Sequence, residues 1–166
     1  SRRIGAKIAL SVHLSNLMTT ELVLGLAESA FSHLAEYTQV VTALGDPFAN
    51  STLASTSAEL ALAKGDPKAA LRHLKTALKI DHEFGTEKEI DNLPQLGLMH
   101  LANHDPAAAL KATKKAVETF HRGVFTTVPY FLWWRHTQAL TANQKTKEAS
   151  QAIEQAYDLL LKRVAN

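Results

Sequence analysis

The sequence contains no cysteine among its 166 residues. Disulfide bonds, thiolate zinc sites and thiol nucleophiles are therefore excluded, and the redox state of the protein's compartment stays open. The sequence also lacks a large excess of charge of either sign, because 18 basic residues nearly balance 16 acidic ones and leave a net charge of +2. Such a balance gives no reason to expect a polyanion as partner, so we do not predict direct binding to nucleic acid.

Long apolar runs and catalytic motifs are missing as well. No apolar stretch approaches the ~20 residues that a helix needs to cross a membrane, so we expect a cytoplasmic protein with no membrane contact. The sequence has neither a Gly-x-Ser-x-Gly elbow nor a Gly-Lys-Ser/Thr phosphate loop, and we therefore predict neither catalysis nor a cofactor. The chain ends, Ser1-Arg2-Arg3 and Val164-Ala165-Asn166, suggest a fragment of a larger protein.

Alanine and leucine dominate the hydrophobic residues, which make up 46% of the chain, and this favours an all-α fold. The clearest local signal is Gly65-Asp66-Pro67. Glycine suits the left-handed position after a helix, aspartate caps the next helix, and proline fits its first turn. Ala70, Leu74 and Ala77 then recur on one helical face. This stretch therefore predicts two helices joined by a tight turn.

The same pattern returns along the chain with a fixed period. Equivalent small residues are separated by 40, 39 and 40 positions: Ala30, Ala70, Ala109 and Ala149. Two helices per period of this size are typical of a right-handed α-solenoid, a superhelix of stacked antiparallel pairs. We expect four such units in a single domain over residues 1–166, at about 4–43, 47–84, 86–122 and 127–165.

Two of the expected helices are less regular than the others. The apolar pattern predicts a first helix over 4–18 and a long second helix from about Thr20 to Ala43. In the helix predicted over 86–103, Pro94 falls among apolar positions. An interior proline costs roughly 3 kcal/mol, so we expect this helix either to kink or to start near Asn92.

These repeats resemble the tetratricopeptide repeat (TPR) family. The match rests on Gly65, Asp66, Ala70, Leu74 and Ala77, and in the last unit on Trp133, Ala149 and Ala156. The units are longer than the usual 34 residues, as in the repeat arrays that follow the ATPase modules of bacterial signal-transduction and transcription-activator proteins. The resemblance implies a TPR-like superhelix that serves as a binding or sensing scaffold.

Two clusters of polar residues allow more than one interpretation. His100 and His104 have the i, i+4 spacing of a metal pair. Because they lack the carboxylate of the His-Glu-x-x-His motif, we favour ordinary surface or boundary groups and predict no metal site. A basic stripe on one helix could meet an acidic partner, although a solvated face is the favoured interpretation. It comprises Lys68, Arg72, Lys75 and Lys79.

Five aromatic residues between positions 125 and 134 form the more informative cluster. Successive helix residues differ in direction by about 100°, so Trp133 and Trp134 cannot both point into the core. The TPR register places Trp133 in the core and Trp134, with Phe131, on the concave groove; alternatively, both cover a following repeat. The groove residues implied by this register are Glu59, Leu62, Asp91, Leu98, Leu101, Phe131, Trp134 and Gln138.

The leading hypothesis is a non-enzymatic scaffold or sensor module that binds a protein or peptide segment in its groove. An apolar segment with some basic character fits the predicted lining, and an exposed end repeat would also allow homo-oligomers. The alternative is a small-molecule effector domain of a bacterial signal-transduction ATPase or transcriptional regulator.

Overall fold

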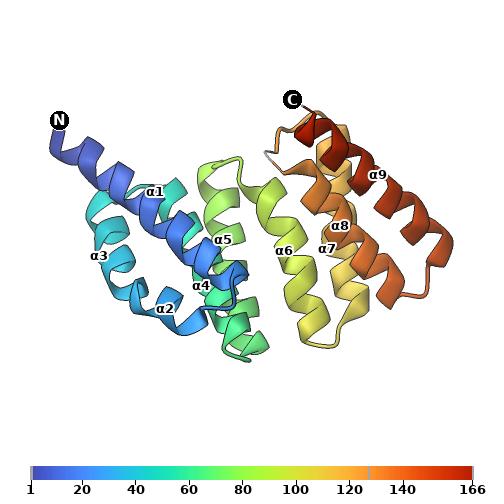
Figure 1. Cartoon of the computed structure of the whole chain (residues 1–166), viewed down its shortest axis with the longest axis horizontal. Helices are drawn as coiled ribbons and strands as arrows, with labels where there is room; N and C mark the ends of the chain where they lie inside the picture. The colour runs from blue at the N-terminus through green and yellow to red at the C-terminus, as the bar shows by residue number, and fades with distance from the viewer. Residues whose placement is uncertain (1, 127, 166) are drawn as a thin grey trace. The chain divides into compact units, whose positions relative to one another are not determined.

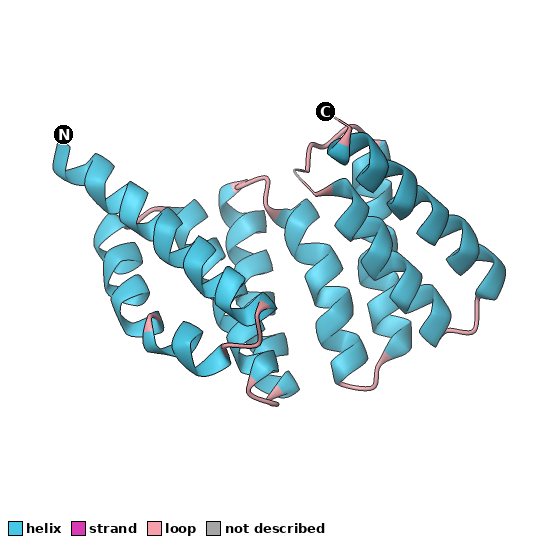
Figure 2. Ribbon diagram, viewed as in Figure 1, coloured by secondary structure: helices cyan, strands magenta, loops and turns pink. Residues whose placement is uncertain are grey.

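The computed structural model of the chain describes residues 2–126 and 128–165, with side chains from Ile4 onwards. Within these residues all regular secondary structure is helical, and Figure 2 shows no strand among them. The predicted all-α class is therefore confirmed.

The described residues form helices that divide into two compact units between Lys88 and Glu89. We call the part up to Lys88 unit 1 and the part from Glu89 onwards unit 2 (Figure 1). Unit 1 contains α1 (Arg2–Val23), α2 (Ala27–Ser32), α3 (Leu34–Leu44), α4 (Pro47–Ala63) and α5 (Pro67–Phe84). Unit 2 contains α6 (Glu89–Ala102), α7 (Pro106–His121), α8 (Pro129–Ala142) and α9 (Thr146–Val164).

Aspartate caps start three of the helices as the sequence predicts. The carboxylates accept hydrogen bonds of 2.8, 2.8 and 2.9 Å from the backbone N–H three residues further on. In each case the next residue is a proline in the first turn, where its missing N–H is not needed. The three caps are Asp46, Asp66 and Asp105, at the starts of α4, α5 and α7.

Each helix pair turns at a residue in the left-handed conformation. At the α4–α5 turn Gly65 has φ 78°, its N–H donates to the carbonyl of Leu62 (3.0 Å), and the next N–H, of Asp66, donates to Ala61 (2.9 Å). This pair of bonds is the Schellman helix end. The equivalent residues in the four pairs are Gly25, Gly65, His104 and Gln144, again 40, 39 and 40 positions apart.

The single long helix predicted from Thr20 to Ala43 is wrong. The first helix continues to Val23 and ends at Gly25, whose φ is 77°, and α2 and α3 then occupy the rest of that stretch. The apolar spacing on both sides of Gly25 has the same period, so periodicity alone does not reveal the break. A left-handed residue reverses the chain here, because the helix can end with the same two backbone bonds as at Gly65.

Pro94 lies inside α6, which begins at Glu89, so the alternative of a helix start near Asn92 is wrong. The proline is the sixth residue of the helix, and its missing N–H deprives only the carbonyl of Ile90 of its helical donor. Its ring is fully buried in unit 2. Burial of this apolar surface offsets part of the lost hydrogen bond.

Small residues let the helices approach closely within each pair. The four alanines that define the repeat, at positions 30, 70, 109 and 149, are all buried. In unit 1 a buried carboxylate adds a polar contact: Asp81 on α5 accepts hydrogen bonds from the hydroxyls of Ser51 and Thr86, both 2.5 Å long. In unit 2 Gly97 on α6 faces Thr113 on α7.

Substituting Gly97 by alanine should destabilise unit 2. A Cβ at this position would lie 2.5 Å from Cγ2 of Thr113, and this methyl group cannot rotate away without moving a hydroxyl that contacts His136 and Leu110. We expect a loss of about 1–3 kcal/mol in the free energy of unfolding, measured by urea denaturation. The matched control is Gly5→Ala on α1, whose Cβ meets no described atom within 4 Å; it should gain up to about 1 kcal/mol.

Candidate functional site

The two tryptophans at the start of α8 take different environments. Trp133 packs against the core cluster of unit 2. Its ring centroid lies 5.8 Å from that of His121 and 6.1 Å from that of His136. Trp134 is 44% exposed. The core position that the TPR register gives Trp133 is therefore confirmed. Trp134 is the most exposed of the aromatic side chains on α8.

Trp134 borders two neighbouring hollows of about 340 and 660 Å³ between α8 and α9, which together we call the α8/α9 furrow. The apolar part of the furrow is lined by Tyr130, Phe131, Trp134, Ile153, Ala156, Tyr157 and Leu160. Tyr157 is the most exposed of these, at 60%. Large apolar side chains gathered in this way are unusual on a protein surface and mark binding sites.

Arg135 and Gln138 add polar groups to α8 beside the furrow. The guanidinium of Arg135 lies over the ring of Phe131, 4.6 Å from its centroid, and its Nη1 donates a 2.9 Å hydrogen bond to Oε1 of Gln138. The cation–π contact and the hydrogen bond hold the Phe131 ring and the Gln138 amide in fixed orientations. Three of the predicted groove residues, Phe131, Trp134 and Gln138, are thus brought together.

The repeat itself shows what covers an equivalent furrow. Forty positions before Ile153 and Trp134 lie Thr113 on α7 and Pro94 on α6. Thr113 is only 1% exposed, whereas Ile153 is 37% exposed, and Pro94 is likewise fully buried. In unit 2 α8 packs on both α6 and α7, and Nδ1 of His136 on α8 lies 2.9 Å from Oγ1 of Thr113. A helix therefore fills the α6/α7 counterpart of the furrow.

The other predicted groove residues lie on the first helices of their pairs. Leu98 is half-buried on α6, and Leu101 packs against the core cluster of unit 2. Asp91 accepts a 2.6 Å hydrogen bond from the hydroxyl of Thr126 and so holds the segment that leads into α8. Glu59 and Leu62 are half-buried on α4 of unit 1. Their role in binding stays a prediction.

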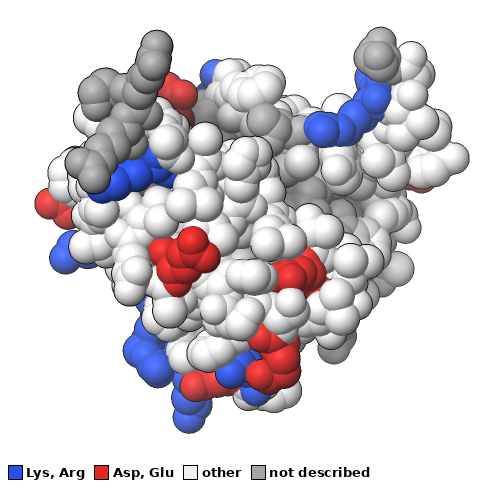
Figure 3. Space-filling view, turned by 60° about the vertical axis from the view of Figure 1, so that its left-hand side comes forward, with Lys and Arg blue, Asp and Glu red and all other residues white. Residues whose placement is uncertain are grey.

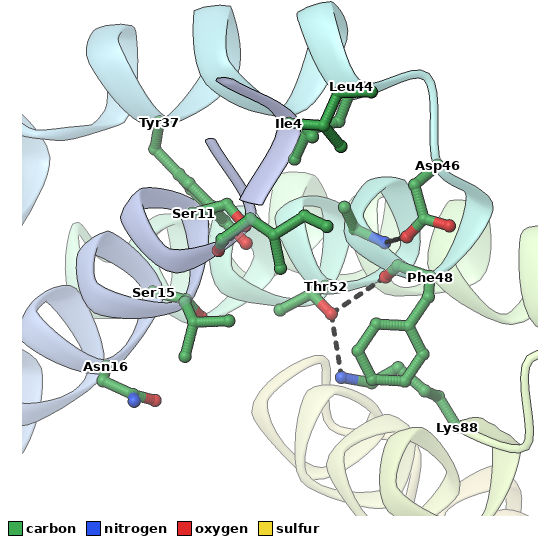
Figure 4. Close-up of a pocket in the computed structure, with 13 residues that line it drawn as sticks. Ile4, Ser11, Ser15, Asn16, Tyr37, Leu44, Asp46, Phe48, Thr52 and Lys88 are labelled. Atoms are coloured by element: carbon green, nitrogen blue, oxygen red, sulfur yellow. Dashed lines mark hydrogen bonds between the residues drawn. The ribbon is translucent and has the colours of Figure 1, made fainter. Parts of the chain in front are cut away.

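Unit 1 contains a pocket that the sequence interpretation missed, with a volume of about 520 Å³ (Figure 4). Residues of α1, α3 and α4 line it together with Lys88, and none of the predicted groove residues is among them. A usable signal was present, because Ile4, Ile8 and Val12 recur every four residues along α1 and line one wall.

Charged side chains are interspersed on the face shown in Figure 3, where no area of one sign dominates. The basic stripe predicted on α5 is exposed at all four positions, as expected of a solvated face. Among the described residues no group of three or more His, Asp or Glu side chains is placed to hold a metal ion. None of the described helices combines the length and apolar character of a membrane span.

His136 is a buried titratable group on α8, the helix that carries Trp134. It is 7% exposed, and burial lowers its pKa from 6.5 to about 4, with a smaller contribution from the positive charge of Lys114. The imidazole is therefore neutral at pH 7, and Nδ1 shares a hydrogen bond with the Thr113 hydroxyl. This contact connects α8 to α7 and fixes the helix that carries Trp134.

Comparisons with known proteins identify the fold. No protein-family model matches the sequence, and neither does any curated protein. Solved structures do match, and two of them are TPR-like repeats of a kinesin light chain-like protein from Podosopora anserina, one of these a variant. The variant superimposes with a TM-score of 0.66 at 14% identity over 94% of this chain and 77% of that one; the other gives 0.60 at 14% identity over 92% and 76%. The chain therefore has a TPR-like repeat fold.

The lowered pKa of His136 predicts a pH dependence of stability. Between pH 6.5 and about 4 the unfolded chain binds a proton that the folded chain does not. The free energy of unfolding should therefore decrease as the pH is lowered through this window. The loss is roughly 3 kcal/mol at most. We expect His136→Gln to remove this part of the slope in urea denaturation series from pH 7 to 4. The exposed His73 provides the control, and an equal slope in His73→Gln and His136→Gln would contradict the assignment.

Proposed function

We propose that the chain is a non-enzymatic interaction module that binds a helical segment of a partner protein in the α8/α9 furrow. The observation that carries this proposal is the repeat equivalence: the counterpart of the furrow on α6 and α7 is covered by helix α8. A surface of the same construction on α8 and α9 suits an occupant of the same kind. The TPR-like fold supports the proposal, since such repeats commonly mediate protein–protein interaction.

The furrow favours an amphipathic helix with an apolar stripe and basic flanks. Trp134 and Tyr157 provide the large aromatic surfaces that typically anchor an interface. Glu154 and Asp158 are exposed on α9, next in the chain to Ile153 and Tyr157. Their carboxylates would pair with lysine or arginine beside the apolar stripe, and this pairing would select basic over acidic helices.

The remaining parts of the sequence hypothesis fit this proposal. Glu59, Leu62, Asp91, Leu98 and Leu101 remain proposed partner-binding residues on the first helices of the other pairs. If the chain forms homo-oligomers through this face, a second copy would compete with the partner helix for the furrow. The long repeat unit supports a place as the scaffold or sensor part of a larger cytoplasmic regulator of the bacterial signal-transduction type.

Fluorescence of Trp134 provides a direct test, because the chain has only two tryptophans. In a Trp133→Phe background we expect the emission of Trp134 to shift to shorter wavelength when a synthetic amphipathic helix with a leucine stripe and lysine flanks is added. By isothermal titration calorimetry in the wild-type background, Trp134→Ala should weaken binding of the same peptide about thirtyfold, the effect of losing a ~2 kcal/mol hot spot.

Phe125→Ala is the matched control, since Phe125 is an exposed aromatic residue of unit 2 that does not line the furrow. It should leave the affinity unchanged. Equal affinity of wild type and Trp134→Ala, or equal binding of a peptide with glutamate flanks, would refute the proposed site and its charge preference respectively.

A further inference from the structure

The pocket of unit 1 has one helical wall that is apolar at one end and polar at the other. We propose that it binds a small uncharged amphiphile, a ligand with an apolar chain and a neutral head group that both donates and accepts hydrogen bonds. This proposal concerns unit 1 alone and does not depend on the α8/α9 furrow. The volume of about 520 Å³ lies in the range of known small-molecule sites.

Helix α1 supplies this graded wall. Ile4, Ile8 and Val12 line the pocket over the first part of the helix, and Ser15 and Asn16 line it further along. At a rise of 1.5 Å per residue, the lining from Ile4 to Asn16 extends over about 18 Å. A ligand that follows this wall along its length therefore needs an apolar end and a polar end.

The apolar part of the pocket is largely open to solvent. Leu44 on α3 and Phe48 on α4 line it together with the isoleucines of α1 (Figure 4). Ile8 is 51% exposed and Phe48 is 53% exposed. An alkyl chain would remove this surface from water, at about 25 cal/mol for each Å² of apolar area buried. Burial of apolar surface would therefore provide most of the affinity.

The polar end of the wall presents neutral hydrogen-bonding groups. Asn16 is exposed, and a side-chain amide both donates and accepts hydrogen bonds. Ser15 is half-buried, and Tyr37 lines the pocket from α3. Burial raises the pKa of Tyr37, which keeps its hydroxyl uncharged at neutral pH. A hydroxyl or amide head group matches such a surface.

The charged residues of the described lining favour neither sign of ligand charge. Asp46 caps α4 by accepting a 2.8 Å hydrogen bond from a backbone N–H. Nζ of Lys88 donates a 2.9 Å hydrogen bond to Oγ1 of Thr52 and lies 4.6 Å from the centroid of the Phe48 ring. The protein thus engages both charges, which are opposite in sign, and Figure 4 shows both residues on the side of the view opposite to Asn16. An ionised head group beside Asn16 would lose its hydration without gaining a counter-ion from this lining, which is costly.

Nuclear magnetic resonance of isoleucine methyl groups tests the proposal in the full chain. Ile4 and Ile8 line the pocket, whereas Ile153 lies on α9 and reports on the furrow. We expect decan-1-ol to shift the Ile4 and Ile8 methyl signals saturably at concentrations that leave Ile153 unchanged. Decanoate and decyltrimethylammonium, below their micelle concentrations, should bind about tenfold more weakly, because each brings a charge that the pocket does not pair.

A second comparison separates the head group from the apolar chain. The ether 1-methoxydecane has the same alkyl chain but donates no hydrogen bond, and the wild type should prefer decan-1-ol to it about fivefold, the effect of one neutral hydrogen bond. Asn16→Leu should abolish this preference, whereas Val12→Ala should weaken both ligands equally. Gln39→Leu makes an equivalent change at an exposed position of α3 that does not line the pocket, and as the control it should change neither affinity.

Four results would each overturn the proposal. They are shifts that never saturate, equal shifts at Ile153, charged amphiphiles that bind as tightly as decan-1-ol, and an unchanged preference for the alcohol over the ether in Asn16→Leu.

Discussion

The left-handed turn between the two helices of each pair is the constraint on which the fold depends. It sets the point at which the chain reverses, and the small residue five positions later then allows the helices to close on each other. In unit 1 the turn residues are Gly25 and Gly65, whereas in unit 2 they are His104 and Gln144, which reach φ 59° against a steric cost of roughly 1 kcal/mol each. The packing of the helix pairs therefore requires a left-handed residue at each turn, whether or not that residue is glycine.

Most of the fold could be predicted from the sequence because capping and repetition reinforce each other. Asp66 and Pro67 mark a helix start by local chemistry, and the recurrence of alanine every 39 or 40 positions extends that start to the other pairs. The first pair was predicted less well because its break at Gly25 lies inside an unbroken apolar pattern. Counting forty positions back from Gly65 would have found it, since the turn obeys the same period as the alanines.

The candidate sites were less predictable because they depend on which faces other helices cover. Trp134 could be recognised as an outward residue from its position next to Trp133, but its neighbours on α9 follow only from the packing of the last pair. Lys88 carried no signal at all: it lies between helices, and its place beside Phe48 results from the turn that follows α5. Contacts between residues that are 36 or more positions apart in the chain are not encoded in any local pattern.

The indole of Trp133 shows which force dominates the interior of unit 2. Its Nε1–H is buried and has no hydrogen-bond acceptor among the residues that the structure describes, which forfeits about 1–3 kcal/mol. Even half of the 150–250 Å² that a tryptophan can bury contributes roughly 2–3 kcal/mol, and its edge-on contacts with two histidine rings add to this. Burial of the apolar surface of Trp133 thus offsets the cost of its unsatisfied Nε1–H donor. A phenylalanine at this position would retain most of the packing contacts and would not bury an unpaired N–H group.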